Sequence, residues 1–195
     1  VGGEPLILKD TYRLFDLAQK INPKLRWSIT TNGHLEFESK VKKSFKNLNF
    51  RSIAVSIDSI NPEKFKEIRV NGNLEKTQSF LKNLIKYKKE EKLQFHIVCN
   101  FLIQKANYLE LEQMLDYAKS LDIKLYPILL REPEAFSIFT LPYLTIVEIL
   151  DCYLEVYKKH KNLYIFNLIM KISKKLKKED LLKRISIFDQ LKKDI

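Results

Sequence analysis

Short apolar runs alternate with amphipathic segments from the start of the chain to about residue 130, and this alternation restricts the fold more than any other feature. The apolar runs are rich in β-branched and aromatic residues, as expected for strands. The segments between them repeat apolar residues at helical spacing. The predicted strands are 25–31, 52–57, 94–103 and 123–130, and the predicted helices are 11–21, 39–48, one that begins at Asn61-Pro62, 74–89 and 108–120. Strands that alternate with helices form parallel βαβ units with right-handed crossovers.

The strands are expected to be buried on both faces, because runs such as 52–57 (SIAVSI) and 94–103 (QFHIVCNFLI) carry few polar side chains. Runs of this kind are typical of parallel sheets covered by helices. A tight turn at Gly2-Gly3-Glu4-Pro5 implies one more strand before residue 1. The fold class is therefore α/β. Spacing alone leaves two architectures open, most of a (βα) barrel or an open doubly wound sheet.

The alternation stops after residue 132, and the remaining segment is helical and basic. Helices are predicted at 141–157, 163–176 and 180–191. From Lys158 to Ile195 the chain has 12 Lys and Arg against 4 Asp and Glu, within a net charge of +11. Either an anionic partner or a lysine-coated helix face in water explains this excess. Nucleic acid is not expected, because Lys outnumbers Arg there and aromatic residues do not interleave with the basic ones. The predicted domains are 1–132 and 133–195.

The cysteines and histidines offer no local metal site. Cys99 lies in a predicted strand and Cys152 in an apolar helical stripe, so both are expected in the core. Neither forms a CxxC pair, and the three histidines are scattered. Two cysteines are too few for a disulfide framework and fit a reducing cytoplasm. No apolar run approaches the length of about 18 residues that a membrane span needs, so a cytoplasmic protein without a membrane span is expected.

Helix 11–21 is expected to pack one apolar face against the sheet. This face consists of Leu14, Phe15, Leu17, Ala18 and Ile21, which recur at helical spacing. The helix ends before Asn22-Pro23, where proline prevents its continuation.

Small and polar residues follow each predicted strand. Because the carboxyl ends of parallel strands meet at one edge of a sheet, where such folds bind ligands, we expect a ligand site there. For any single group the alternative is ordinary turn chemistry, since Asn-Gly and Asp-Ser are common turn formers. The ordered series favours a site. Its members are Gly2, Gly3, Glu4, Pro5, Thr30, Thr31, Asn32, Gly33, Ser56, Ile57, Asp58, Ser59, Asn100, Pro127 and Ile128.

Five segments of this series and its surroundings resemble the radical S-adenosylmethionine (radical SAM) superfamily. They are G-G-E-P at 2–5, I-T-T-N-G at 29–33, V-S-I-D-S at 55–59, E-K-F-K-E-I-R-V-N-G-N-L-E-K at 63–76, and the run from Val98 to Ile123. Together they cover about residues 1–130. The resemblance implies a partial (βα)₆ TIM-like barrel, lacking its first strand and most of the second, with a helical C-terminal segment.

The resemblance also implies which residues bind SAM. Gly2, Gly3, Glu4 and Pro5 would hold the methionine ammonium, which needs carbonyl oxygens and a carboxylate. Ser56 and Arg69 would hold the SAM carboxylate, as a hydroxyl donor and a fork-shaped cation can. Thr31, Asn32 and Asn100 would line the pocket near the ribose, and Pro127 and Ile128 would contact adenine. Asp58, in the V-S-I-D-S segment, completes the predicted cofactor-binding set.

One motif of the family is missing from this sequence. Radical SAM enzymes bind a [4Fe–4S] cluster through CxxxCxxC, because iron–sulfur clusters are held by thiolates. This chain has two cysteines and no such motif, so neither a metal ligand nor a catalytic residue is predicted. Two interpretations stay open, an internal fragment of a longer enzyme or a degenerate relative. In either case the chain alone is expected to be inactive, and the cluster belongs to the full-length parent only.

The function predicted by this resemblance is that of the SAM-binding core of a radical SAM enzyme. The parent would cleave SAM reductively and abstract hydrogen from an unknown peptide, protein or small metabolite, with a reductant such as flavodoxin or ferredoxin. The alternative is a non-catalytic α/β binding module whose basic tail docks on an anionic partner. A nucleotide-binding enzyme is not supported, because neither GxGxxG nor GxxxxGK[ST] is present.

Overall fold

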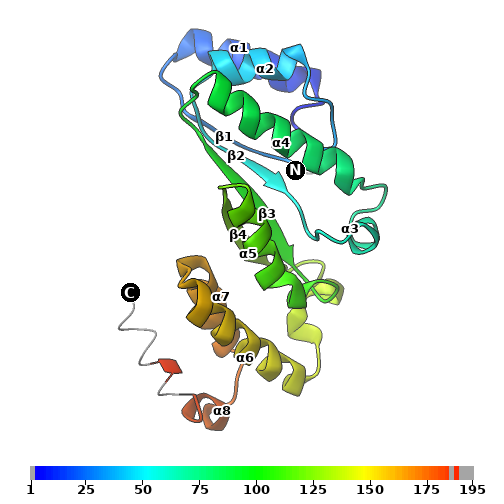
Figure 1. Ribbon diagram of the computed structural model, residues 1–195, viewed down its shortest axis with the longest axis vertical. Helices are drawn as coiled ribbons and strands as arrows, with labels where there is room; N and C mark the ends of the chain where they lie inside the picture. Colours follow the sequence, from blue (N-terminus) through cyan, green and yellow to red (C-terminus); the bar gives the residue numbers. More distant parts are fainter. Residues whose placement is uncertain (1–2, 185–186, 189–195) are drawn as a thin grey trace. The chain divides into compact units, whose positions relative to one another are not determined.

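Four parallel strands form one sheet in the order β1-β2-β3-β4, which confirms the α/β class (Figure 1). The computed structural model describes residues 3–184, 187 and 188. The strands are β1 (Trp27–Thr31), β2 (Phe50–Ser56), β3 (His96–Ile103) and β4 (Lys124–Leu129). In register, Ile29 pairs with Ile53, and Ile53 pairs with Ile97.

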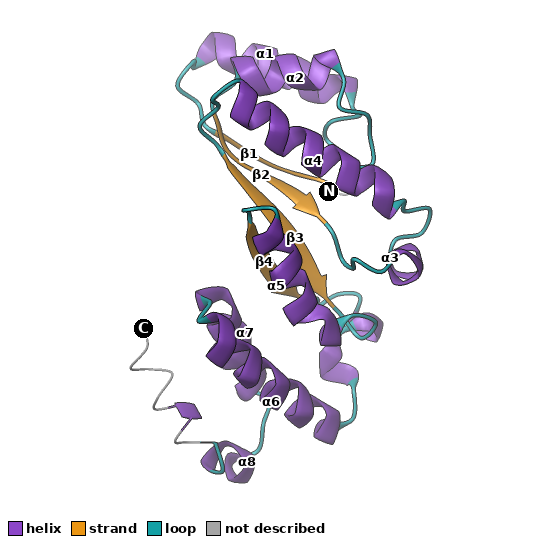
Figure 2. Ribbon diagram, in the orientation of Figure 1, coloured by secondary structure: helices purple, strands orange, loops and turns teal. Residues whose placement is uncertain are grey.

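Helices connect these strands and continue after the sheet (Figure 2). They are α1 (Lys9–Ile21), α2 (Ser39–Asn47), α3 (Pro62–Ile68), α4 (Leu74–Glu90), α5 (Leu111–Ser120), α6 (Tyr143–His160), α7 (Leu163–Ser173) and α8 (Lys178–Leu182), with single 3₁₀ turns η1 (Tyr108–Glu110), η2 (Glu134–Phe136) and η3 (Ile138–Thr140). Asparagines begin three of them. The side chains of Asn61, Asn73 and Asn162 accept a hydrogen bond from a backbone N–H in the first turn of α3, α4 and α7.

The chain divides into two compact units. The N-terminal unit comprises residues 1–100 and 117–125, and the C-terminal unit comprises 101–116 and 126–195. The division predicted at residue 132 stays a prediction. None of the helices in the described part of the chain is long and apolar enough to cross a membrane.

An aromatic cluster forms the core of the N-terminal unit. Phe15 of α1 lies edge-on to Trp27 of β1 and Phe50 of β2, with ring centroids 4.7 and 6.0 Å apart. Phe45 of α2 packs against the same Phe50 and against Phe95. Figure 1 shows α4 running along β1 and β2. Edge-to-face rings fill space without an unfavourable face-to-face contact, so these side chains join α1 and α2 to the sheet.

The apolar face predicted for α1 is wrong in part. Phe15 is buried, but Leu14, Leu17 and Ile21 are 54%, 57% and 76% exposed, and Tyr12 takes their place in the core. The Tyr12 hydroxyl donates to the carbonyl of Leu6 at 2.7 Å. The aromatic contacts of Phe15 and this hydrogen bond turn the helix so that its leucine stripe faces away from the cluster. The predicted stripe is therefore an exposed apolar surface next to β1, the outermost strand of the order.

Two helices build the core of the C-terminal unit. Buried aliphatic residues of α6 and α7 face each other, and the buried Tyr153 hydroxyl donates to the carbonyl of Tyr108 at 2.9 Å. The predicted helix 180–191 is not continuous, because α8 ends at Leu182, residues 183–184 form a turn, and residues 187–188 are helical again. The part of that prediction at 185–186 and 189–191 lies outside the described residues.

The prediction that both cysteines are core residues is right for Cys99 and wrong for Cys152. Cys99 is fully buried in β3, whereas Cys152 is exposed. The buried face of α6 is fixed by Ile149, Tyr153 and Val156, so Cys152 falls on the outer face beside Asp151. Burial raises the pKa of the Cys99 thiol to about 12.

This difference predicts that one of the two thiols reacts in the native chain. At mildly alkaline pH a disulfide reagent such as Ellman's is expected to modify Cys152 and to reach Cys99 only in denaturant, because the thiolate is the reactive species. The Cys152→Ser variant should show no native reaction. Rapid labelling of two thiols in the folded wild type would contradict the burial of Cys99.

Candidate functional site

The carboxyl end of β1 is held by a single carboxylate. Glu4 Oε1 accepts a hydrogen bond from Thr31 Oγ1 at 2.6 Å, and Glu4 Oε2 accepts one from the backbone N–H of Asn32 at 2.7 Å. The backbone N–H of Leu6 also donates to Oε1 at 3.1 Å. Glu4 thus joins the first turn of the chain to the end of a strand 27 residues away, and its charge is placed at the edge of the sheet.

The turn that follows β1 depends on Gly33. Its φ of +65° lies in the left-handed region, and a Cβ atom there would meet Val55 Cγ1 at 3.1 Å and Phe80 Cδ1 at 3.2 Å. Glycine is the residue that adopts this conformation without strain. The side chain of Thr31 accepts a hydrogen bond from the backbone N–H of Gly33 at 3.0 Å, and that of Asn32 accepts one from the backbone N–H of His34 at 2.8 Å. The left-handed conformation of Gly33 and these two hydrogen bonds therefore fix the backbone of the turn.

Thr77 is a site residue that the sequence did not indicate. It lies on α4, is 1% exposed, and donates from Oγ1 to the carbonyl of Asn32 at 3.0 Å. This hydrogen bond joins residues 45 positions apart. A buried threonine in an amphipathic helix resembles any other core position, so no local pattern distinguishes it.

The ends of β2 and β3 lie side by side. Ser56, the last residue of β2, is the register partner of Asn100 on β3, and the backbone N–H of Ile57 donates to the carbonyl of Asn100 at 2.9 Å. Both side chains are half-buried. Two residues predicted from separate segments are therefore brought together by the parallel register.

A buried ion pair follows β2. Arg69 donates from Nε and from Nη2 to Oδ2 of Asp58, at 2.8 and 2.7 Å. The Asp58 side chain is 4% exposed and that of Arg69 is 28% exposed. Arg69 Nη1 has no hydrogen bond within the part of the chain that the structure describes, so one edge of the guanidinium is still available to a ligand.

Charge and burial shape this edge of the N-terminal unit. A carboxylate, Glu4, stands at the end of β1, and a guanidinium, Arg69, is held after β2. Burial raises the pKa of the Tyr12 phenol, and the negative charge of Glu4 adds to this effect. A carboxylate fixed at the end of β1 and a guanidinium that ends α3 and is held by Asp58 suit a zwitterionic ligand, because an ammonium and a carboxylate each meet a complementary partner.

The other predicted site residues are distributed as follows. Gly3 and Pro5 lie in the N-terminal unit beside Glu4, while Gly2 lies outside the described residues. Pro127 and Ile128 lie on β4 in the C-terminal unit. The N-terminal unit therefore contains nine of the described site residues: Gly3, Glu4, Pro5, Thr31, Asn32, Ser56, Asp58, Arg69 and Asn100.

An iron–sulfur cluster does not fit the residues present. No group of three or more His, Cys, Asp or Glu that could hold a metal occurs among residues 3–184, 187 and 188. Of the two cysteines, Cys99 is buried in the sheet and Cys152 lies in the other unit. Cluster ligation needs several converging thiolates, so the described residues supply no step through such a group.

Comparison with known families decides the identity of the fold. The model of the Radical SAM superfamily matches residues 1–118. This chain belongs to the radical SAM superfamily. The family implies SAM and a [4Fe–4S] cluster as cofactors.

Several enzymes are similar to this radical SAM chain over part of their length. The "Probable GTP 3',8-cyclase" of Methanococcus maripaludis is 28% identical over 120 residues, which are 62% of this chain and 38% of that protein. The "GTP 3',8-cyclase" of Limosilactobacillus fermentum is 31% identical over 124 residues, 63% of this chain and 35% of that protein. The Clostridium botulinum (strain Hall) protein of the same name is 37% identical over 75 residues, which are 38% of this chain and 23% of that protein. The chain thus spans well under half the length of these relatives.

A solved structure shows the same fold. SuiB of Streptococcus suis, in a crystal structure bound to S-adenosylmethionine, matches with a TM-score of 0.55 and 13% identity, over 82% of this chain and 34% of SuiB. This likeness confirms the partial radical SAM barrel with C-terminal helices. It favours that architecture over the open doubly wound sheet, the alternative that spacing had left open.

Proposed function

We propose that the N-terminal unit binds the amino-acid part of SAM at the carboxyl ends of β1 and β2, as the SAM-binding core of a radical SAM enzyme. The observation that carries this proposal is the presence of two fixed charges of opposite sign, one at the end of β1 and one that ends α3 and is bound to Asp58 just after β2. Glu4 is held by Thr31 and Asn32, and Arg69 is held by Asp58. Ligands of parallel α/β folds bind at this end of the strands.

Each charged group has a distinct task in this proposal. The negative charge of Glu4 attracts the SAM ammonium, and its existing hydrogen bonds keep it in place. The free Nη1 edge of Arg69 donates to the SAM carboxylate, while Asp58 occupies the other edge and orients the guanidinium. Ser56 and Asn100, paired across β2 and β3, offer a hydroxyl and an amide beside these groups. Preorganised donors bind with little reorganisation.

We propose further that the cluster ligands of the active enzyme come from residues beyond this chain. In such an enzyme a [4Fe–4S] cluster would supply the electron for reductive cleavage of SAM, while the residues of this chain would hold SAM in place. Two observations support a longer protein. The chain spans 38% of the M. maripaludis relative, and the leucine stripe of α1 beside β1 is an exposed apolar surface that a neighbouring barrel helix would cover.

GTP is the first substrate to test, because the relatives are named GTP 3',8-cyclases. The assay is anaerobic reconstitution of the longer protein with a reductant, followed by detection of 5′-deoxyadenosine with and without GTP. 5′-Deoxyadenosine without dependence on GTP would retain the enzyme proposal and reject this substrate. A reconstituted cluster without SAM cleavage would favour the alternative, a non-catalytic binding module.

SAM binding by the chain itself tests the site directly. Titration calorimetry with SAM is expected to give saturable binding, and Glu4→Gln is expected to weaken it about tenfold, since one charged hydrogen bond is worth about 1.5 kcal/mol or more. The matched control is Glu67→Gln, an exposed residue on α3 that loses the same charge. A folded wild-type chain that binds no SAM, or equal weakening by both variants, would overturn the proposal.

A further inference from the structure

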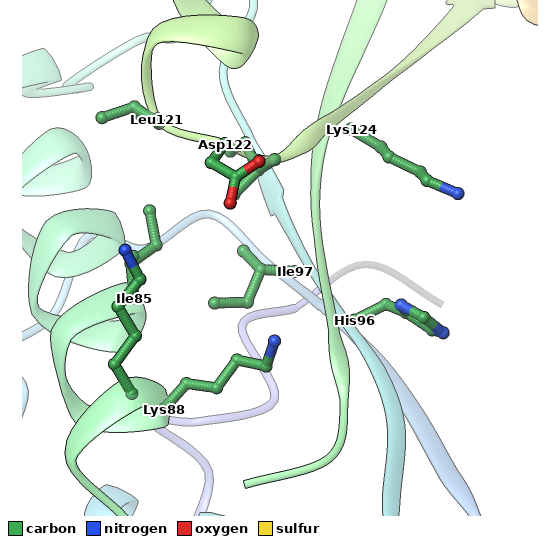
Figure 3. A pocket seen from close by; sticks show the side chains of 9 residues that line it. Ile85, Lys88, His96, Ile97, Leu121, Asp122 and Lys124 are labelled. Carbon is green, nitrogen blue, oxygen red and sulfur yellow. The ribbon is translucent and has the colours of Figure 1, made fainter. Parts of the chain in front are cut away.

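A groove with an apolar floor and lysine walls lies on the N-terminal unit away from the proposed SAM site. It consists of two adjoining hollows of about 170 and about 400 Å³, which share Ile85, Lys89 and Leu121 as walls. In Figure 3, the side chains of Lys88 and Ile97 point toward one another across the smaller hollow, and the Asp122 carboxylate lies at its rim. All lining residues belong to the N-terminal unit.

This groove lies at the amino ends of the strands. His96 and Lys124, the first residues of β3 and β4, border it. The proposed SAM site uses Thr31 and Ser56, which are the last residues of β1 and β2. Since parallel strands run in the same direction, the two sites are at opposite ends of the sheet. The groove is therefore not part of the SAM site.

The floor of the groove is aliphatic. Ile97 is 7% exposed on β3, and Ile85 of α4 and Leu121 are half-buried beside it. Asp122, which follows, has a φ of 55° and turns the chain into β4. A floor of this kind gives an apolar side chain of a partner a place to be buried.

The walls carry unpaired positive charge. Lys82, Lys86 and Lys89 recur at spacings of four and three on α4, so they share one face over about 10 Å. Of these, Lys86 is paired, because its Nζ lies 3.8 Å from Oε1 of Glu90. Lys82, Lys88 and Lys89 have no ion pair with any residue of the described part of the chain.

We propose that this groove docks an acidic segment of a partner protein that carries an apolar anchor residue. The apolar floor buries the anchor, and the lysines pair with carboxylates on either side of it. A lone anion fits less well, because Asp122 would repel it, whereas a peptide N–H can donate to that carboxylate. Nucleic acid fits less well too, because His96 is the single ring among the described residues that line the groove, whereas a strand binds by stacking successive bases on several aromatic side chains.

The test is fluorescence anisotropy with a labelled synthetic peptide of alternating Glu and Leu, titrated with the whole chain. Saturable binding is expected. Lys82→Glu combined with Lys89→Glu should weaken it about tenfold or more. The matched control is Lys20→Glu combined with Lys43→Glu, which makes the same change of charge on exposed positions of α1 and α2. SAM affinity should be unchanged in both.

Two further measurements distinguish an acidic peptide with an apolar anchor from other ligands of the groove. A peptide with Ser in place of Leu, and the Ile85→Ser variant with the original peptide, should each bind several-fold more weakly if the floor takes part. If the all-polar peptide bound equally well, charge alone would explain the binding, and the proposal would be overturned. Equal weakening by the control variant, or tighter groove-dependent binding of duplex DNA or of anionic lipid vesicles, would overturn it too.

Discussion

Replacing Gly33 by alanine is expected to lower the free energy of unfolding of the N-terminal unit by about 3 kcal/mol. The left-handed φ of +65° costs a residue with a Cβ about 1–2 kcal/mol. The new methyl would also press on Val55, Phe80 and Thr77 at 3.1–3.3 Å, and overpacking of a core costs about 1–3 kcal/mol. The measurement is urea unfolding followed by the emission of Trp27, which is the single tryptophan and lies on β1 in the same unit.

Asn71→Ala is the control for the backbone alone. Asn71 also has a left-handed φ, 61°, but it is exposed, so alanine there should cost about 1 kcal/mol without a packing penalty. An equal loss in both variants would show that contacts around Gly33 do not matter. A Gly33→Ala chain as stable as wild type would contradict the turn geometry described above.

Replacing Arg69 by leucine should destabilise the same unit by about 3 kcal/mol. It leaves the Asp58 carboxylate, 4% exposed, without the guanidinium that donates two hydrogen bonds to it. Removal of one partner of a buried ion pair is costly because the remaining charge stays desolvated. Trp27 emission in urea again reports the change. Arg69→Lys should cost less, because it keeps the charge and loses the fork geometry.

The double variant Asp58→Asn with Arg69→Leu separates the pair from its surroundings. It is expected to recover part of the stability lost in Arg69→Leu, since the buried carboxylate that loses the guanidinium is replaced by a neutral amide. Additive losses would show that the two side chains act independently. SAM affinity should fall in every variant that lacks Arg69, and retention of wild-type affinity in Arg69→Leu would remove this residue from the proposed site.

Secondary structure was largely predictable because the periods of the apolar residues are local. The four strands were found within a few residues of their positions, and Asn61-Pro62 marked the start of α3 as expected. The orientation of α1 was not predictable. Apolar side chains lie on more than one face of that helix. Periodicity therefore could not show that Tyr12 and Phe15 would be buried and the leucine stripe exposed. The same ambiguity put Cys152 on the wrong face of α6.

The candidate site was predictable as a set of positions and not as a set of contacts. Glu4, Thr31 and Asn32 were identified from strand ends and from the family resemblance. The hydrogen bonds that Thr31 and Asn32 donate to Glu4, and the pairing of Asp58 with Arg69, were absent from that prediction. Arg69 had been assigned to a ligand alone, and the structure shows that two of its three guanidinium nitrogens already contact a buried carboxylate.

The sequence by itself determined the order of strands and helices, the family, and the polar residues that end each strand. Only the tertiary structure decided which of these residues touch. The physical reason is distance along the chain. The parallel register of β1 and β2 and the packing of α4 bring together Glu4, Asn32 and Thr77. Such contacts depend on how whole elements pack, and local spacing carries no information about them.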